Sequence, residues 1–186
     1  MGLPSKPELR REFIARRQVM KPDEVQRRSA EICGHIATSS LFLDAPRLFA
    51  YLAHRNEVDT TPLIEAGLAA GKAILCPITR GEELVWGMVS SLDGLRRGAH
   101  GIREPEQACE VLPCPDDLCI VPGVAYRHDG TRLGQGGGHY DRFLATFPGV
   151  SIAPAYSWQL SEEIVPEPHD IPVTFIATEC GISDTR

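Results

Sequence analysis

The amino-acid sequence predicts an α/β protein, a three-layer, Rossmann-like domain in which helices cover both faces of a mainly parallel sheet. Apolar runs with the length of single strands alternate along the chain with segments of helical periodicity. Each run is almost continuously apolar, as expected for a strand buried on both faces of a parallel sheet. At 186 residues the chain has the size of one domain, so we expect residues 1–186 to form a single unit.

Three helices are predicted in the first half of the chain. Apolar residues recur at helical spacing over residues 6–20, which predicts the first helix. Proline at a first-turn position, followed by two acidic residues, predicts a second helix over 22–37. Thr61 is a suitable cap for a third helix over 62–71, which begins with proline and ends at glycine.

Short apolar runs predict the strands of the sheet, and these runs cover residues 46–53, 72–78, 118–122, 150–156 and 172–178. Residues 83–89 are compatible with an exposed strand, and the glycine-rich, charged segment 92–107 predicts a loop or a short irregular layer. Apolar residues at positions 140, 143, 144 and 147 predict one more helix. In open sheets of this class ligands bind beyond the carboxyl ends of the strands, so the loops after residues 52, 122 and 156 are the first places to look for chemistry.

The charge of the protein is unevenly distributed. The formal net charge is −6, but residues 1–35 contain eight basic and five acidic side chains. An acidic protein lacks the broad basic face that nonspecific nucleic-acid binding needs, so we do not expect a nucleic-acid partner. The basic N-terminal segment is compatible with binding of a small anion.

The six cysteines form no CxxC pair and match no zinc-site spacing, which predicts free thiols in a reducing compartment. No segment has the roughly 18 consecutive apolar residues of a membrane-spanning helix. The first residues also lack the apolar stretch of a secretory signal. We therefore expect a cytoplasmic protein without a membrane partner.

The strongest functional motif is the glycine-rich run between Arg132 and Arg142. Four glycines within positions 134–138 let the backbone bring its N–H groups close to a ligand, and the start of the following helix adds a positive end. This layout suits a polyphosphate, with the two arginines available for phosphate oxygens and Asp141 for a magnesium ion. The alternative is a glycine-rich turn before a capped helix, in which Asp141 is only a favourable first-turn acid.

Several segments together resemble one protein family. They are KPELR near the N-terminus, YLAHRNEVDT, the GIREP turn, PGVAYRHDGTRLGQGGGHYDRFL around the glycines, and PHDIPV near the C-terminus. In this order they resemble the 5-formyltetrahydrofolate cyclo-ligase family over nearly the whole chain. The resemblance implies ATP- and magnesium-dependent closure of 5-formyltetrahydrofolate to 5,10-methenyltetrahydrofolate, with release of ADP and phosphate. We therefore expect small-molecule partners and a monomer, with Mg²⁺ as cofactor and ATP as co-substrate.

The resemblance also implies roles for individual residues. The ATP contacts it implies are Lys6, Arg10, Arg132, Leu133, Gly134, Gln135, Gly136, Gly137, Gly138, His139 and Tyr140. Arg132 and Asp141 would act in catalysis. From the residues alone, a solvated basic helix face is the favoured interpretation of Lys6 and Arg10, since their i, i+4 spacing only places them side by side, and only the resemblance reverses it.

For the folate, the resemblance implies contacts from Leu52, Glu57, Gln135, Gly136, Gly137, Gly138 and His139, and for magnesium it implies Asp141 and Asp170. A glutamate is chemically suited to a pterin because its two acceptor oxygens match paired N–H donors. Without the resemblance, Leu52 would be assigned to the core, Glu57 to an ordinary loop and Asp170 to a cap or turn beside Pro172. His169 could orient Asp170, and Arg103 in the GIREP turn fits either an anion contact or a surface turn.

Two positions in the glycine-rich segment depart from the family pattern, and Thr174 replaces a frequently polar or acidic residue in the last expected strand. His139 stands where the family usually has tyrosine, and Gln135 stands where an aromatic or basic residue is common. Three rival functions stay open at this point. They are a paralogue that activates another substrate with ATP, a protein that binds folate or nucleotide without catalysis, and a sugar-phosphate isomerase or deaminase that would not need ATP.

Overall fold

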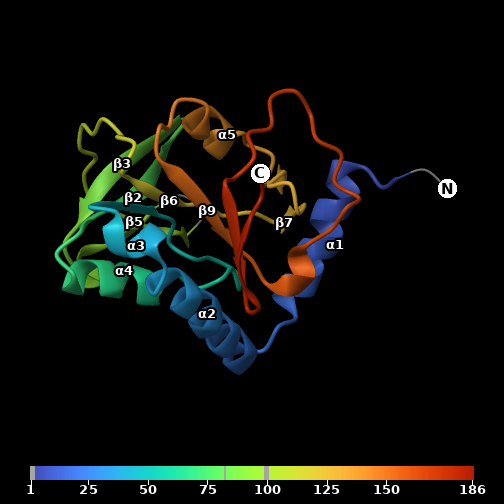
Figure 1. The fold of residues 1–186 in the computed structure, drawn as a ribbon, viewed down its shortest axis with the longest axis horizontal. Helices are drawn as coiled ribbons and strands as arrows, with labels where there is room; N and C mark the ends of the chain where they lie inside the picture. The colour runs from blue at the N-terminus through green and yellow to red at the C-terminus, as the bar shows by residue number, and fades with distance from the viewer. Residues whose placement is uncertain (1–2, 82, 99–100) are drawn as a thin grey trace.

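The computed structural model describes residues 3–81, 83–98 and 101–186. Its centre is a seven-stranded sheet with the strand order β11-β10-β9-β6-β1-β2-β3 (Figure 1). The strands are β1 (Arg47–Ala50), β2 (Ala73–Arg80), β3 (Glu83–Val89), β6 (Leu118–Ile120), β9 (Val150–Pro154), β10 (Phe175–Thr178) and β11 (Gly181–Asp184). The five inner strands are parallel and the two edge strands, β3 and β11, are antiparallel to their neighbours, which confirms the α/β class and the mainly parallel sheet.

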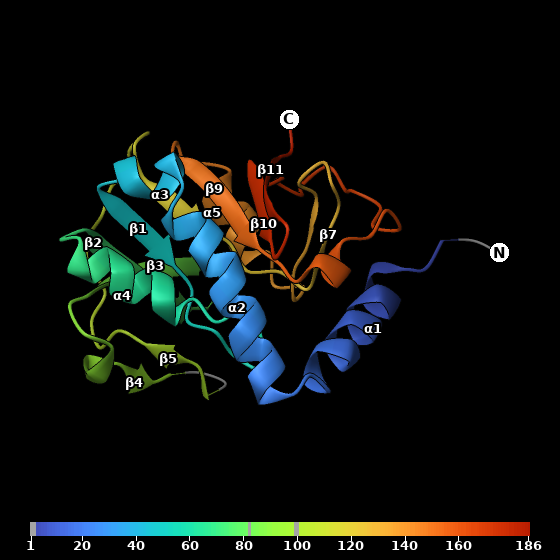
Figure 2. The same ribbon diagram turned by 60° about the horizontal axis from the view of Figure 1, so that its bottom comes forward.

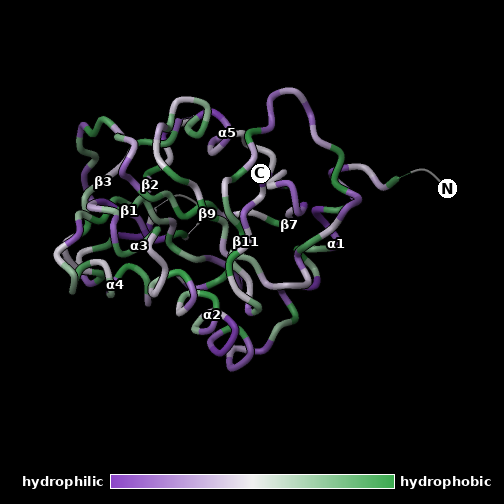
Figure 3. The backbone as a smooth tube through the Cα atoms, in the orientation of Figure 1, coloured by the Kyte–Doolittle hydropathy of each residue, from purple (hydrophilic) through white to green (hydrophobic). Residues whose placement is uncertain are grey.

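The sheet has a hydrophobic core on each face because successive residues of its inner strands point to opposite sides. In β1, Leu48 and Ala50 belong to one cluster of buried side chains, and Phe49 between them belongs to the other. The first cluster packs under α2 (Pro22–Ala37), α3 (Ser40–Asp44) and α4 (Thr61–Ala69), and the second under α5 (His139–Leu144) and its neighbouring loops. The prediction of helices on both faces is confirmed. Figure 3, coloured by residue hydropathy, shows hydrophobic residues along the strands of the sheet.

Helix α1 (Lys6–Gln18) lies apart from the sheet, beside the hairpin of β7 (Ala125–Tyr126) and β8 (Arg132–Leu133) (Figure 2). Leu9 and Phe13 of this helix pack with Val124 and Ile164 in a third, smaller cluster. The Ser5 side chain and Glu8 form a capping box that begins the helix. The N-terminal helix is therefore fixed against the segment that leads into the glycine-rich run.

Most of the expected helices and strands are present, but some differ in their bounds or in how they are connected. The residue before α4 is Thr60, one position earlier than predicted, and its hydroxyl donates to the Tyr51 carbonyl instead of capping the helix. The described residues of the segment 92–107, which leave out 99 and 100, include a short 3₁₀ turn (Leu92–Gly94) and paired strands β4 (Arg96–Arg97) and β5 (Arg103–Glu104), the irregular layer expected. The glycine-rich run does not follow the buried strand at 118–122 directly, because the β7–β8 hairpin lies between them.

Candidate functional site

One cavity of about 300 Å³ lies at the carboxyl ends of β1 and β6. The chain leaves β1 toward β2 on one side and later returns to form β6 on the other, so these neighbours mark the point where the strand order reverses. Ligands bind at such a switch point in open α/β sheets. The loops after residues 52, 122 and 156 all line the cavity as predicted, the last of them through Glu167, His169 and Asp170.

The structure brings every candidate residue together at this cavity. Its lining includes Lys6, Arg10, Leu52, Glu57, Arg132, Leu133, Gly134, Gln135, Gly136, Gly137, Gly138, His139, Tyr140, Asp141 and Asp170. These residues come from α1, from the loop after β1, from the glycine-rich run and from the segment before β10. Their roles stay predictions, since convergence alone assigns no ligand.

The glycine-rich run forms a tight loop between β8 and α5. Gly136 and Gly138 have φ values of 99° and 64°, which only glycine adopts without strain. The Arg10 Nε donates to the Gly134 carbonyl at 2.8 Å and so ties α1 to the loop. A side chain at Gly134 would lie 2.7 Å from the Arg132 guanidinium, so the absence of a Cβ lets that arginine approach the loop.

Arg132 is buried at the base of the loop and is paired with Asp141. The Arg132 Nη2 donates to the Asp141 Oδ1 at 3.0 Å, and its guanidinium lies over the Tyr140 ring. The Arg132 Nε and the Tyr140 Oη are buried without a hydrogen-bond partner in the part of the chain that the structure describes. Burial raises the pKa of the Tyr140 phenol, which keeps it a neutral donor. These two atoms leave hydrogen-bonding capacity for a polar ligand in the cavity.

On another wall, the Lys6 ammonium is held between two carboxylates. Its Nζ donates to the Glu167 Oε2 at 2.6 Å and to the Asp170 Oδ2 at 2.7 Å. Burial lowers the pKa of Lys6, but the hydrogen bonds to the two carboxylates outweigh that cost and leave the pKa raised. Burial likewise opposes the ionised form of Asp170, but the bonds from Lys6 and from the Glu167 N–H lower its pKa. Both side chains of the Lys6–Asp170 pair are therefore charged at neutral pH.

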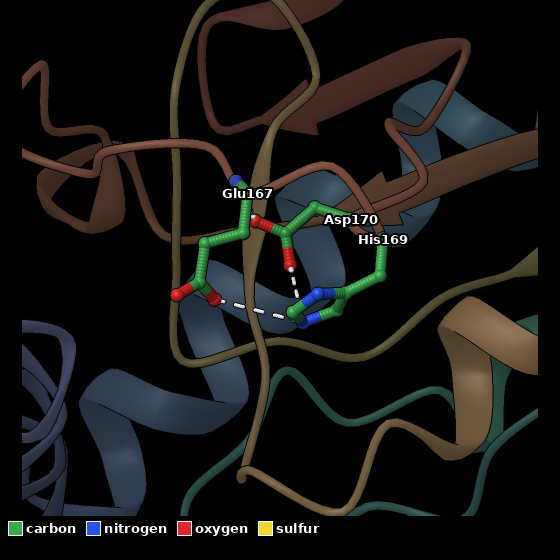
Figure 4. Close-up of side chains that lie close together, drawn as sticks. All are labelled: Glu167, His169 and Asp170. Carbon is green, nitrogen blue, oxygen red and sulfur yellow. Dashed lines mark hydrogen bonds and ion pairs between the residues drawn. The ribbon is translucent and has the colours of Figure 1, made fainter.

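His169 lies beside the same carboxylates, as Figure 4 shows. Its Nε2 is 3.5 Å from the Glu167 Oε2 and 3.8 Å from the Asp170 Oδ1. His169 therefore lies close enough to Asp170 to orient its carboxylate, as the sequence suggests. Glu167, His169 and Asp170 present ligand atoms within 4.8 Å of one another, the spacing of a possible metal group. Asp141 is not part of that cluster, but its Oδ1 accepts the N–H of Ile171, the residue after Asp170, at 3.3 Å.

Glu57 extends into the cavity from the loop after β1, where Leu52 is almost fully buried. The Glu57 Oε2 accepts the His54 N–H at 3.0 Å. Burial raises the pKa of the Glu57 carboxyl, and the Arg17 guanidinium and the His54 N–H oppose that shift. An acceptor with two oxygens thus stands in a largely apolar wall, which is suited to a flat ligand with paired donors.

The two departures from the family pattern in the glycine-rich segment are both at the cavity. A ring nitrogen of His139 lies 3.1 Å from the Gly81 carbonyl, which anchors the imidazole to the turn between β2 and β3. Gln135 is exposed in the loop. Arg103 of β5 is exposed and also lines the cavity, so its role as an anion contact stays a prediction.

Sequence reasoning missed several lining residues. Pro77, Thr79 and Leu84 come from the far ends of the β2–β3 hairpin, and Tyr51 follows β1. No motif marks them, because they belong to apolar runs that are typical of any buried strand. Glu167 could have been found, since it is an acid three residues before Asp170 in the same loop.

Among the helices that the structure describes, none combines the length and the apolar composition needed to cross a membrane.

Comparisons with known proteins agree with one another. Residues 3–179 match the model of the 5-formyltetrahydrofolate cyclo-ligase family. A probable 5-formyltetrahydrofolate cyclo-ligase from Caenorhabditis elegans is 33% identical over 67% of this chain and 65% of its own length. The 5-formyltetrahydrofolate cyclo-ligase of Escherichia coli is 30% identical over 88% of this chain and 94% of its own. The NMR structure of 5,10-methenyltetrahydrofolate synthetase from Aquifex aeolicus superposes with a TM-score of 0.86 at 34% identity, covering 97% of this chain and 93% of that protein.

Proposed function

The chain belongs to the 5-formyltetrahydrofolate cyclo-ligase family, and from that premise we propose that its cavity closes 5-formyltetrahydrofolate to 5,10-methenyltetrahydrofolate with ATP. Membership makes the protein an ATP-dependent ligase that forms a C–N bond. The site assignment rests on one observation, that the residues implied by the resemblance lie together around one cavity. Lys6 and Asp170, more than 160 positions apart in the sequence, line the same cavity. We propose that residues 1–186 form a single domain, which would hold both substrates in this cavity.

The reaction needs ATP because the formyl oxygen is a very poor leaving group. In the proposed sequence the formyl oxygen attacks the γ-phosphorus and ADP departs, which converts that oxygen into a phosphate ester. The neighbouring folate nitrogen then attacks the activated carbon and loses its proton, and phosphate leaves with the electrons of the C–O bond. Little covalent chemistry falls to the protein, whose task is to position the two substrates and neutralise charge.

We assign the triphosphate to the side of the cavity formed by α1 and the glycine-rich loop. Lys6 and Arg10 supply two cations from one face of α1, and the loop from Leu133 to His139 supplies backbone N–H groups. The Arg132 Nε, which is buried and has no hydrogen-bond partner among the described residues, is suited to a phosphate oxygen near the transferred group. Tyr140 contributes its unpartnered hydroxyl to the same region.

We assign the reduced pterin to the side of the cavity nearest β1. Leu52 offers an apolar surface to the ring, and the Glu57 carboxylate accepts its neighbouring N–H and NH₂ donors. Gln135, Gly136, Gly137, Gly138 and His139 border both assigned ligands, so the formyl group and the γ-phosphate would meet beside the glycine-rich loop.

Magnesium fits the carboxylates of Asp141 and Asp170. Carboxylate oxygens are the ligands that Mg²⁺ prefers, usually one or two of them together with phosphate oxygens and water. Both side chains line the cavity, and the Ile171 N–H links their segments. When bound, the ion would neutralise charge on the phosphates, while Arg132 keeps Asp141 oriented through the 3.0 Å ion pair.

We further propose a cytoplasmic monomer that acts on these small molecules and on no nucleic acid. The proposed site needs no residue from a second copy, because the residues assigned to both substrates all belong to one chain. The thiols support a reducing compartment, because all six cysteines are free and burial raises the pKa of Cys33 and Cys76 to about 12.

The test is a turnover assay with 5-formyltetrahydrofolate, ATP and magnesium chloride, which follows the ultraviolet absorbance of the methenyl product. Product and ADP should form in equal amounts, and neither should form without ATP. ADP formation only with another substrate would identify a paralogue. Tight folate or nucleotide binding without product would identify a binding protein, and either result would overturn the proposed function.

A further inference from the structure

Arg17 is a buried charge that the proposed function does not use. It lies in the last turn of α1, is 3% exposed and is not part of the cavity wall. Burying a charged side chain costs several kcal/mol unless a partner compensates it. A buried arginine next to a binding site therefore needs a partner that compensates its charge.

The partner of Arg17 is Glu57. The Arg17 Nη1 lies 3.4 Å from the Glu57 Oε1, and the Glu57 side chain is only 16% exposed. The Arg17 Nε and Nη1 have no hydrogen-bond partner among the residues that the structure describes. The contact thus acts mainly through charge, in surroundings where water screens little of it.

The loop that carries Glu57 is fixed to the same end of α1. Arg55 and Asn56 have φ values of 49° and 61°, a left-handed conformation that costs free energy for residues other than glycine. The Asn56 Nδ2 donates to the carbonyls of Arg17 and Met20 at 3.1 and 3.2 Å and so satisfies the C-terminal end of the helix. The last turn of α1 therefore sets the position of Glu57 through both backbone and charge.

Arg17 is the only cation that forms an ion pair with Glu57 in the described part of the chain. Among the described residues, the phenols of Tyr51, Tyr126 and Tyr140 also interact with the carboxyl. Burial raises the pKa of each phenol, so all three are neutral at physiological pH. The His54 N–H adds one hydrogen bond from the loop itself.

We propose that Arg17 is a positioning residue for folate binding, which holds the Glu57 carboxylate charged and directed into the cavity so that it accepts the paired donors of the pterin. The proposal rests on the proposed function, because it takes Glu57 as the pterin acceptor. Arg17 itself touches neither substrate. Its contribution should therefore appear in the binding of folate and depend on Glu57.

The test compares Arg17→Met and Arg17→Lys with the unchanged protein in the turnover assay across pH. Without the cation, burial of Glu57 is uncompensated, so the acid limb of kcat/KM for 5-formyltetrahydrofolate should move up by about one pH unit or more. At neutral pH the KM for 5-formyltetrahydrofolate should rise about tenfold, the effect of losing roughly 1.4 kcal/mol of binding. The KM for ATP should stay unchanged, and Arg17→Lys should restore most of the folate affinity.

Arg16→Met is the matched control, since it removes one arginine from the adjacent position, where the guanidinium lies over the exposed side of Trp158. Its pH profile should equal that of the unchanged protein. Circular dichroism and thermal unfolding of each variant report whether the fold is kept.

A double-mutant cycle separates positioning from a general structural effect. In a Glu57→Gln background, Arg17→Met should cause no further rise in the folate KM. An equal rise in both backgrounds, or an unchanged pH profile in Arg17→Met, would overturn the proposal. A wild-type folate KM in Glu57→Gln alone would instead reject Glu57 as the pterin acceptor, which is a failure of the proposed function.

Discussion

Lys6 and Asp170 form an ion pair of 2.7 Å across 164 positions of the chain. In the structure, the residue assigned to the ATP phosphates and a residue assigned to magnesium neutralise each other. Binding of ATP with its metal ion would replace this pair with two new ones, ammonium to phosphate and carboxylate to cation. The pair therefore maintains charge balance in the cavity before the substrates arrive.

Lys6→Met should raise the KM for ATP about tenfold, because one charge-assisted hydrogen bond is worth roughly 1.5–3 kcal/mol. The fold should be kept, since the start of α1 is held by its capping box and by buried Leu9. Initial rates at varied ATP measure the change. Lys21→Met, an exposed lysine at the start of α2, is the control. An ATP dependence that is equal in all three proteins would limit Lys6 to a structural role.

Asp141→Asn should lower kcat on the order of 100-fold, since an amide supplies no charge for the metal ion or for buried Arg132. Single-turnover rates at saturating magnesium measure the loss. Asp129→Asn makes the same chemical change in the β7–β8 turn, outside the cavity, and should leave kcat unaltered. Full turnover in Asp141→Asn would remove this carboxylate from the catalytic site.

Gly136→Ala tests the shape of the glycine-rich loop. Alanine at a φ of 99° costs about 1–2 kcal/mol, so the loop should relax and the KM for ATP should rise about tenfold. Gly71→Ala imposes a similar strain at a φ of 72° just after α4, far from the cavity lining, with open space around the new Cβ. It should lower the thermal midpoint without changing the KM. If both variants keep the KM of the unchanged protein, the loop conformation is not what binds ATP.

Glu179→Gln tests a contact that stabilises the fold. Burial opposes the charged form of Glu179, but bonds from Arg28 and the Ser157 N–H lower its pKa below the usual value. A carboxyl with a lowered pKa stabilises the folded protein above its unfolded pKa and loses that contribution as pH falls through the folded value. The substitution should therefore cost about 1–2 kcal/mol near neutral pH and little at about pH 3.

Urea unfolding at the two pH values measures this difference. Glu31→Gln is the control, because the Arg27–Glu31 pair is exposed on α2 and such pairs contribute roughly 0.3–0.5 kcal/mol. An equal cost for Glu179→Gln at both pH values would contradict the charge-based explanation.

The sequence was sufficient to predict the long elements because their periodicity is strong. Helix α2 spans residues 22–37 as predicted, with Pro22 at its first position. The two-residue strands β7 and β8 were missed, although Asp129-Gly130 is a typical turn signal and Gly130 has a φ of 83°. Strand β11 was missed because its four residues, Gly181–Asp184, contain a single large apolar side chain and pair only at the sheet edge.

The predicted site residues do line one cavity, but the contacts between their side chains were not predicted. Motif order suggested Lys6, Asp141 and Asp170, but no spacing along the chain indicates that Lys6 pairs with Glu167 or that Arg17 lies behind Glu57. Such pairs depend on how α1 packs beside the sheet. That arrangement arises from tertiary packing of a few apolar residues, for which local propensity gives no signal.

The placement of α1 also has a consequence for biosynthesis. Lys6 is translated 164 positions before Asp170, its partner in the cavity. Until the segment with Glu167, His169 and Asp170 has been added, the nascent chain lacks one wall of the cavity and cannot form the complete site. A product truncated before residue 167 should therefore be inactive.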